Sequence, residues 1–260
     1  MIATFLYEVA ADHKIGLVRK TNQDYAHAWV STHGMPTALL IVADGIGGNN
    51  HPAGEIAGAL AISTISDSLM PALSPVSSTF LSMEQLQQKL RLAIQRAHTT
   101  LLHEGSHNPK LANMGTTVAC ALVRGSQAII AHVGDSRVYL HSHGILTQLT
   151  ADHSEVGELI REGILEPDHL YTHPNRNIVT RALGISSRLE VDTRTMDLAP
   201  GDRLMLCTDG LWKMVFDFRI AHILSSTPTS QTAVDTLIAT ALDHGGEDNI
   251  AVVVCDVQQV

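Results

Sequence analysis

The pattern of apolar and polar positions predicts two helices in the first half of the chain. Small and apolar residues recur at helical spacing between Gly54 and Met70. A clearer one-sided stripe follows over 86–101, where the apolar residues lie mostly three or four positions apart. The segment 71–82, with its Pro and Ser residues, joins the two helices and is too short to separate two domains.

The pattern then changes to short strands that are rich in β-branched residues and separated by glycine-containing turns. The predicted strands are 38–43, 116–123, 128–133, 137–142, 146–150, 203–208 and 249–257. The predicted helices of this part are 154–163, with Ser154 as its N-cap and Gly163 at its end, 217–225 and 230–243. Strands outnumber helices and come in blocks. The chain is therefore predicted to be an α+β domain in which helices cover antiparallel sheets.

The composition changes this picture little, because 45% hydrophobic and 17% charged residues are usual for a globular protein. The formal net charge of -9, with Lys and Arg scattered, argues against nucleic-acid binding. No apolar run approaches the roughly 20 residues of a membrane span, and the N-terminus lacks the basic start of a signal peptide. Three cysteines in apolar runs indicate buried thiols in a reducing compartment: Cys120, Cys207 and Cys255. We therefore expect a cytoplasmic protein with no membrane partner.

Five aspartates lie at the ends of apolar, strand-like segments: Asp24, Asp44, Asp135, Asp209 and Asp248. A single Asp-Gly after a strand is usually only a turn. Strands of one sheet share an edge, however, so these carboxylates are able to converge, and converging carboxylates repel unless a cation offsets them. The glycine cluster at 45–48 indicates backbone brought close to a ligand. Oxygen ligands favour Mg²⁺ or Mn²⁺ over Zn²⁺. The 15 histidines show no ligand spacing and are interpreted as surface or loop residues.

Eight short motifs follow one another in a fixed order along the chain. They are R-x-x-N-Q-D (19–24), V-A-D-G-x-G-G (42–48), G-T-T (115–117), H-V-G-D-S-R (132–137), L-T-x-D-H-S (149–154), T-R-A-L-G (180–184), C-T-D-G-L-W (207–212) and E-D-N (247–249). In this order they resemble the metal-dependent protein phosphatase family, often called type 2C, and above all its compact bacterial members. The likeness extends from about residue 10 to 257. It implies two antiparallel β-sheets packed face to face with helices on the outer faces, in one catalytic domain over 1–260.

The resemblance also implies a metal site for Mn²⁺ or Mg²⁺, with two ions and, more weakly, a third. Asp44 would bridge two metals, and the Gly45 carbonyl would complete one coordination sphere. Asp209 and Asp248 would hold the other metal, while Asp24 would act directly or through coordinated water. Asp135 would share the third ion with Asp209.

The implied reaction is direct hydrolysis of a phosphomonoester by a metal-activated water, with no covalent phosphoenzyme. Arg19, five residues before Asp24, would bind the phosphate oxygens with its planar guanidinium; a solvated surface charge is the alternative. The segment 155–180 would form an irregular, mobile flap beside the site, suited to substrate selection. Three histidines near this segment are candidate donors to phosphate or leaving group, although a structural role is the favoured interpretation: His153, His169 and His173.

Two positions depart from the bacterial pattern. Ile46 stands where Met is usual and Asn49 where His is common, with His51 two residues on, so no general acid is assigned. The predicted function is that of a monomeric serine/threonine protein phosphatase, acting on phosphoproteins made by a Ser/Thr protein kinase. Two alternatives stay open: a catalytically weak regulatory or binding module with the same fold, and a phosphatase of small-molecule phosphoesters. Retention of Arg19 and of four of the metal-site aspartates weighs against the first.

Overall fold

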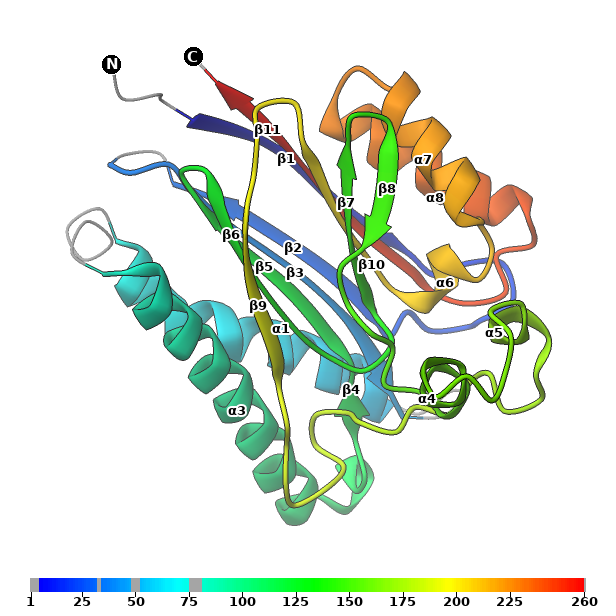
Figure 1. Cartoon of the computed structure of the whole chain (residues 1–260). Coiled ribbons are helices and arrows are strands. Elements are labelled where there is room, and N and C mark those ends of the chain that lie inside the picture. Colours follow the sequence, from blue (N-terminus) through cyan, green and yellow to red (C-terminus); the bar gives the residue numbers. More distant parts are fainter. Residues whose placement is uncertain (1–4, 32–33, 48–51, 75–80, 260) are drawn as a thin grey trace.

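Two antiparallel sheets face each other in the computed structural model, which describes residues 5–31, 34–47, 52–74 and 81–259 (Figure 1). One sheet has the strand order β1-β11-β10-β7-β8. Its strands are β1 (Phe5–Lys14), β11 (Ile250–Gln259), β10 (Arg203–Cys207), β7 (Arg137–Ser142) and β8 (Ile145–Gln148). The other has the order β2-β3-β5-β6-β9, with β4 paired to β3. Its strands are β2 (Asp24–Val30), β3 (Thr37–Ile46), β4 (Gly115–Thr116), β5 (Val118–Arg124), β6 (Gln127–Val133) and β9 (Asp192–Asp197).

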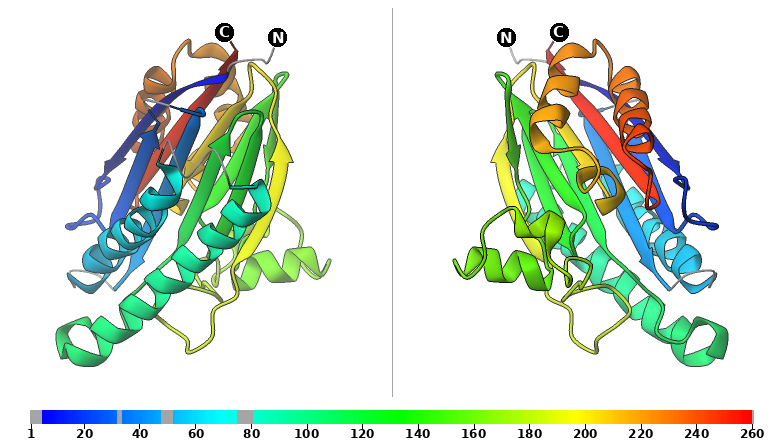
Figure 2. Two further views of the ribbon diagram at one scale, coloured as in Figure 1. Left: turned by 90° about the vertical axis from the view of Figure 1, so that its left-hand side faces the viewer. Right: turned by 90° about the vertical axis from the view of Figure 1, so that its right-hand side faces the viewer.

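Helices cover the outer faces of both sheets, as the two side views in Figure 2 show. The second sheet carries α1 (Pro52–Leu73) and α3 (Met83–His107), and the first carries α6 (Asp209–Trp212), α7 (Asp217–Ser226) and α8 (Ser230–Asp243). The short helices α4 (Glu155–Arg161) and α5 (His169–Thr172) lie at one end, near α6, and η1 (Pro109–Leu111) follows α3 (Figure 1). One apolar core lies between the sheets and one beneath each helical layer. The predicted α+β sandwich is confirmed.

The strands that the pattern did not predict are edge strands: β1, β2 and β9. An edge strand is only half buried, so its apolar residues are diluted by polar ones, as in the DTRTMD sequence of β9. The predicted strand 116–123 is two strands, because the chain breaks between β4 and β5 at Thr117. Predictions in the covered interior hold better: Ser154 caps α4 by accepting the Gly157 N–H, and the three cysteines are buried free thiols.

α1 corrects one expectation from the sequence. In the described part of the chain it is the one helix long and apolar enough to cross a membrane, by length and composition. Half of its apolar window is buried, in the core that it shares with α3 and β3. The statement that no apolar run approaches a span was therefore wrong for 52–73. The residues between α1 and α3 at 75–80 lie outside the described part.

Antiparallel topology brings the ends of five segments to one edge of the sandwich. Neighbouring antiparallel strands run in opposite directions, so the start of one strand lies beside the end of the next. β2 and β11 start at this edge, β3 and β10 end there, and the β6–β7 turn lies there too. Each of these places carries one of the five predicted aspartates.

Candidate metal centre

The five aspartates meet at this edge, around a cavity of about 370 Å³. Asp44, Asp135, Asp209 and Asp248 line the cavity, together with Arg19 and Gly45. Asp24 does not line it, but it is 2% exposed and lies directly opposite Asp44 in the β2–β3 ladder. The structure thus brings together every residue for which a metal or phosphate role is predicted.

Asp44 lies within β3 and not after its end. β5 pairs with β3 only as far as Val42, and β4 pairs with β3 at Gly45 and Ile46, so Thr117 contacts Asp44 between the two ladders. The Thr117 N–H donates to the Asp44 carbonyl (2.9 Å), and the Asp44 N–H donates to Thr117 Oγ1 (3.2 Å). Thr117 Oγ1 also shares a hydrogen bond with Ser136 Oγ (2.7 Å), beside Asp135. Thr117 therefore links the backbone of Asp44 to Ser136, the neighbour of Asp135, a role that sequence reasoning missed although the G-T-T motif contained it.

Glycine is required after Asp44 for helix packing, and not for the close approach of a ligand that the sequence suggested. A Cβ on Gly45 would lie 2.0 Å from the Gly54 carbonyl oxygen, and one on Gly47 would lie 2.2 Å from the Gly54 nitrogen. The first turn of α1 packs directly on this backbone, so helix packing excludes a side chain here. The Gly45 carbonyl as a metal ligand stays a prediction. Gly48 and the departures at Asn49 and His51 lie outside the described residues.

Asp24 is held by the neighbouring sheet. Thr208, which precedes Asp209, donates its hydroxyl to Asp24 Oδ2 (2.6 Å) and accepts the Ala251 N–H on the same oxygen (2.8 Å). Because Asp24 begins β2 and Thr208 follows β10, this hydroxyl ties the ends of the two sheets together. The Thr208 hydroxyl thereby orients the Asp24 carboxylate before any cation binds.

The ionised form of the carboxyl groups at this edge is unfavourable unless a cation offsets the charge. Burial raises the pKa of Asp24 and Asp44 well above the usual carboxyl range, and the surrounding aspartates raise it further. Burial and then the charge of Asp209 raise the pKa of Asp135 to about 7. Asp135 Oδ1 is buried and has no hydrogen-bond partner among the described residues. Oxygen-only donors with this excess of negative charge fit Mg²⁺ or Mn²⁺.

Arg19 lies at the rim of the cavity, on the loop between β1 and β2. Its Nη2 is 2.6 Å from Asp248 Oδ2, and their side chains are 37% and 35% exposed. The guanidinium is therefore close to the carboxylates and still open to solvent, where a substrate phosphate would arrive. A fully solvated surface charge, the alternative interpretation, does not describe this position.

Asn249 fixes the loop that carries Arg19, and the sequence assigned it no role beyond its place in the E-D-N motif. Its side-chain amide donates to the Ile15 carbonyl (2.7 Å) and the Thr21 carbonyl (3.0 Å), and its Oδ1 accepts the Gln23 N–H (2.9 Å). The loop is thus tied at three points to the residue that follows Asp248. Arg19 and Asp248 consequently belong to one fixed unit.

The segment 155–180 lies beside the cavity but is not irregular throughout. It contains α4 and α5. Its two ends lie side by side, because the Glu155 N–H donates to the Ile178 carbonyl (2.9 Å) and the Thr180 N–H donates to the His153 carbonyl (2.8 Å). Asn177, Val179 and Thr180 line the cavity. The helix predicted over 154–163 is present as α4, whereas the prediction of an irregular segment is wrong for α5, and its mobility stays a prediction.

Histidines are less peripheral than the sequence suggested. His98, His132, His141 and His153 are buried, the first three of them within helices or strands, which corrects their interpretation as surface or loop residues. His153 does not line the cavity among the described residues, so its structural role is the better supported one. His169 and His173 lie in and just after α5.

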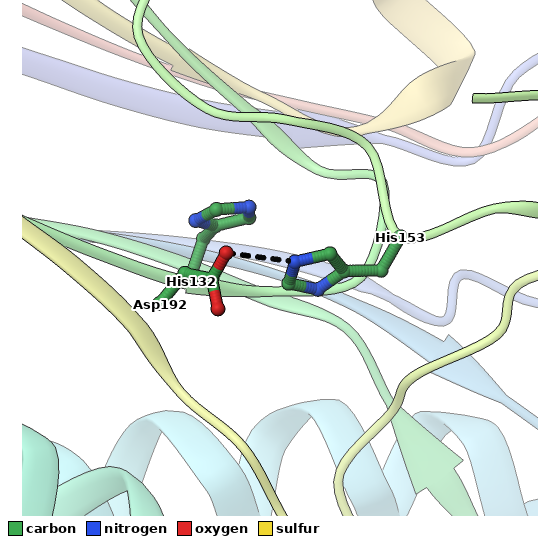
Figure 3. Close-up of side chains that lie close together, drawn as sticks. All are labelled: His132, His153 and Asp192. Carbon is green, nitrogen blue, oxygen red and sulfur yellow. Dashed lines mark hydrogen bonds and ion pairs between the residues drawn. The ribbon is translucent and has the colours of Figure 1, made fainter. Parts of the chain in front are cut away.

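One cluster outside the cavity has metal-ligand residue types: His132, His153 and Asp192 (Figure 3). The Gly134 N–H donates to His153 Nδ1 (3.1 Å), so in the neutral ring the proton is on Nε2, which lies 3.3 Å from Asp192 Oδ2. A metal ligand nitrogen must carry no proton, and both nitrogens of His153 are already used. Arg181 supplies a cation 3.3 Å from Asp192. We therefore interpret the cluster as a hydrogen-bonded network and not as a metal site.

His153 should make the fold sensitive to acid. Burial, followed by the charges of His132 and Arg181, lowers the pKa of His153 from 6.5 to about 4. The folded state binds this proton less well than the unfolded state, so the full stability is present above pH 6.5 and is lost as the pH falls towards 4. The shift corresponds to about 3 kcal/mol of unfolding free energy. His153→Gln, which has no titrating proton, should lack this part of the pH dependence.

The measurement is denaturant unfolding of both metal-free proteins between pH 7 and pH 4. The carboxylates of the metal site titrate in both proteins, so the difference between the two curves reports His153 together with its coupled neighbours His132 and Asp192. Parallel curves would show that His153 titrates normally in the fold.

Comparisons with known proteins show the family to which the chain belongs. A family model described as Protein phosphatase 2C matches residues 18–244. The serine/threonine phosphatase stp of Listeria monocytogenes is 37% identical over 241 residues, which cover 93% of this chain and 92% of that protein. The crystal structure of the Mycobacterium tuberculosis serine/threonine phosphatase PstP/Ppp matches with a TM-score of 0.84 and 33% identity, over 97% of this chain and 99% of that chain. A catalytic domain of PstP in complex with 2 manganese ions matches with a TM-score of 0.82 and 32% identity, over 98% and 100% of the two chains.

Proposed function

This chain belongs to the protein phosphatase 2C family and is a serine/threonine protein phosphatase, and we propose that four of its five clustered aspartates hold the Mn²⁺ or Mg²⁺ ions that its reaction needs. The observation that carries the proposal is the convergence of Asp44, Asp135, Asp209 and Asp248 with Arg19 around one cavity. A PstP catalytic domain with the same fold binds two manganese ions. We assign two ions to this site, held by Asp24, Asp44, Asp209 and Asp248 with the Gly45 carbonyl.

The divalent ions, when bound, would activate a water for direct attack on phosphorus and offset the charge of the phosphate. The protein's own groups have separate tasks. Thr117 fixes the backbone of Asp44, and Thr208 orients the Asp24 carboxylate through a direct hydrogen bond. Arg19 binds two phosphate oxygens and orients the phosphorus towards the cavity. Because Asn249 anchors its loop, Arg19 needs little ordering when substrate arrives.

Arg19→Ala should weaken phosphate binding more than metal binding. A charge-assisted bidentate contact contributes roughly 1.5–3 kcal/mol, or about one to two decades in an equilibrium constant. The Michaelis constant for a phosphopeptide should rise by that factor, and inhibition by free phosphate should weaken equally. Mn²⁺ affinity should not fall, because Arg19 is a competing cation on Asp248 and not a ligand.

Arg19→Lys is the matched control, since it keeps the charge and loses the planar fork, and it should recover only part of the loss. Unchanged phosphate inhibition in Arg19→Ala would place Arg19 outside the phosphate site. Lost Mn²⁺ binding would instead make it a support for the carboxylates.

Substrate class is tested by comparing phosphoserine and phosphothreonine peptides with a small aryl phosphate. A protein phosphatase should have the higher kcat/KM on the peptides, since they contact surface beyond the phosphate. Preference for the small ester would favour the alternative of a small-molecule phosphatase, and no turnover of either with Mn²⁺ would favour a regulatory module.

We further propose that the substrates are products of a Ser/Thr protein kinase. We also propose that the enzyme acts as a cytoplasmic monomer; its three free buried cysteines are in keeping with a reducing compartment.

A further inference from the structure

Lys213 places a second cation at the edge of the cluster of carboxylates, where it lines a neighbouring cavity together with Asp209 and Asp248. Its Nζ is 2.5 Å from Asp209 Oδ2 and 2.8 Å from Asn177 Oδ1. The side chains of Lys213 and Asp209 are only 11% and 13% exposed, so this is not an ordinary surface pair of residues four apart on a helix. Two largely buried charges of opposite sign remain together because separating them would leave each without a partner.

The position of Lys213 is fixed by its neighbour Trp212. The Trp212 Nε1–H donates to the Asp135 backbone carbonyl (3.0 Å), and the Arg137 guanidinium stacks on the Trp212 ring at 3.6 Å from its centroid. α6 is thus held against the turn that carries Asp135. The ammonium consequently lies where its charge acts on Asp209, Asp135 and Asp44 together.

Asp209 and Asp135 are the two residues that the family resemblance implies for a third, weaker ion. Such an ion would need an oxygen of Asp209, and Lys213 already occupies Oδ2 of that carboxylate. A divalent ion beside an ammonium is repelled by it. Resting on the proposed function, we propose that the Lys213 ammonium replaces the third metal ion, so that this chain binds two divalent ions and supplies the third positive charge itself.

Counting bound Mn²⁺ tests this inference without measuring activity. Mn²⁺ is titrated into the metal-free full-length chain, and the free ion is followed by electron paramagnetic resonance up to millimolar concentration. The wild type should bind two ions, and Asp135→Asn should bind the same two. Lys213→Met keeps an unbranched side chain next to Trp212 without the charge. This variant should bind a third ion, with an affinity about tenfold or more above that of the wild type for a third ion. In the double variant Lys213→Met/Asp135→Asn this third site should be lost again.

Lys89→Met is the matched control, because it removes one positive charge from an exposed position on α3 and should leave the count at two. Three ions in the wild type, one of them lost in Asp135→Asn, would overturn the inference and leave the proposed function intact. A count of two in folded Lys213→Met would overturn it as well. If circular dichroism shows that Lys213→Met is unfolded, the wild type and Asp135→Asn decide the question by themselves. Absence of any Mn²⁺ binding to the wild type would overturn the proposed function, and this inference with it.

Discussion

Removal of divalent ions should abolish phosphate release, and Mn²⁺ or Mg²⁺ should restore it. Without cations, Asp24 and Asp44 are buried opposite each other, and burial and the neighbouring carboxylates raise their pKa values because ionised carboxylates repel one another there; the site also offers nothing that activates water. We expect no phosphate release above background in excess chelator. Ion binding should also raise the melting temperature, because the ions bind the folded state and relieve this repulsion.

The measurement is phosphate release from a phosphothreonine peptide before and after chelation, with each ion then added back. Thermal unfolding under the same conditions separates loss of metal from loss of fold. Full activity in excess chelator would contradict the metal centre.

Asp44→Asn should separate activity from stability. Asn keeps the size of Asp44 and removes the charge that would bridge two ions, so turnover should fall by about a thousandfold or more, the scale of losing one charge-stabilising group at a reaction centre. The same change removes a buried carboxyl opposite Asp24, and burial together with repulsion from Asp24 makes the ionised form of this carboxyl unfavourable. The metal-free variant should therefore melt at a higher temperature than the metal-free wild type.

Asp67→Asn serves as the control, since it removes an exposed carboxylate from α1, outside the cavity lining. It should leave both turnover and melting temperature near the wild-type values. Near-normal turnover of Asp44→Asn with Mn²⁺ bound would reassign Asp44 to a structural role. A lower melting temperature of the metal-free variant would show that hydrogen bonds of the carboxylate outweigh the repulsion.

Sequence alone predicted those parts of the fold whose signal is local. The apolar stripe of α3 and the continuous apolar runs of the central strands are local signals, because α3 buries one face and the central strands are buried on both faces. The edge strands β1, β2 and β9 carry less of this signal because solvent reaches them on one side. The chemistry was also local in part: aspartates beside strand ends, with Arg19 five residues before Asp24, already indicated a site for oxygen-binding cations and phosphate.

Only the tertiary structure decided how these residues act on one another. Asp24 faces Asp44 because of the β2–β3 register, and Thr117 reaches Asp44 from a segment far along the chain. Asn249 anchors the Arg19 loop across 228 residues of sequence to Thr21. Lys213 meets both Asp209 and Asn177 because α6 packs beside the segment 155–180. Periodicity and spacing describe neighbours along the chain, whereas these contacts follow from strand register and helix packing, which form only when the whole chain is folded.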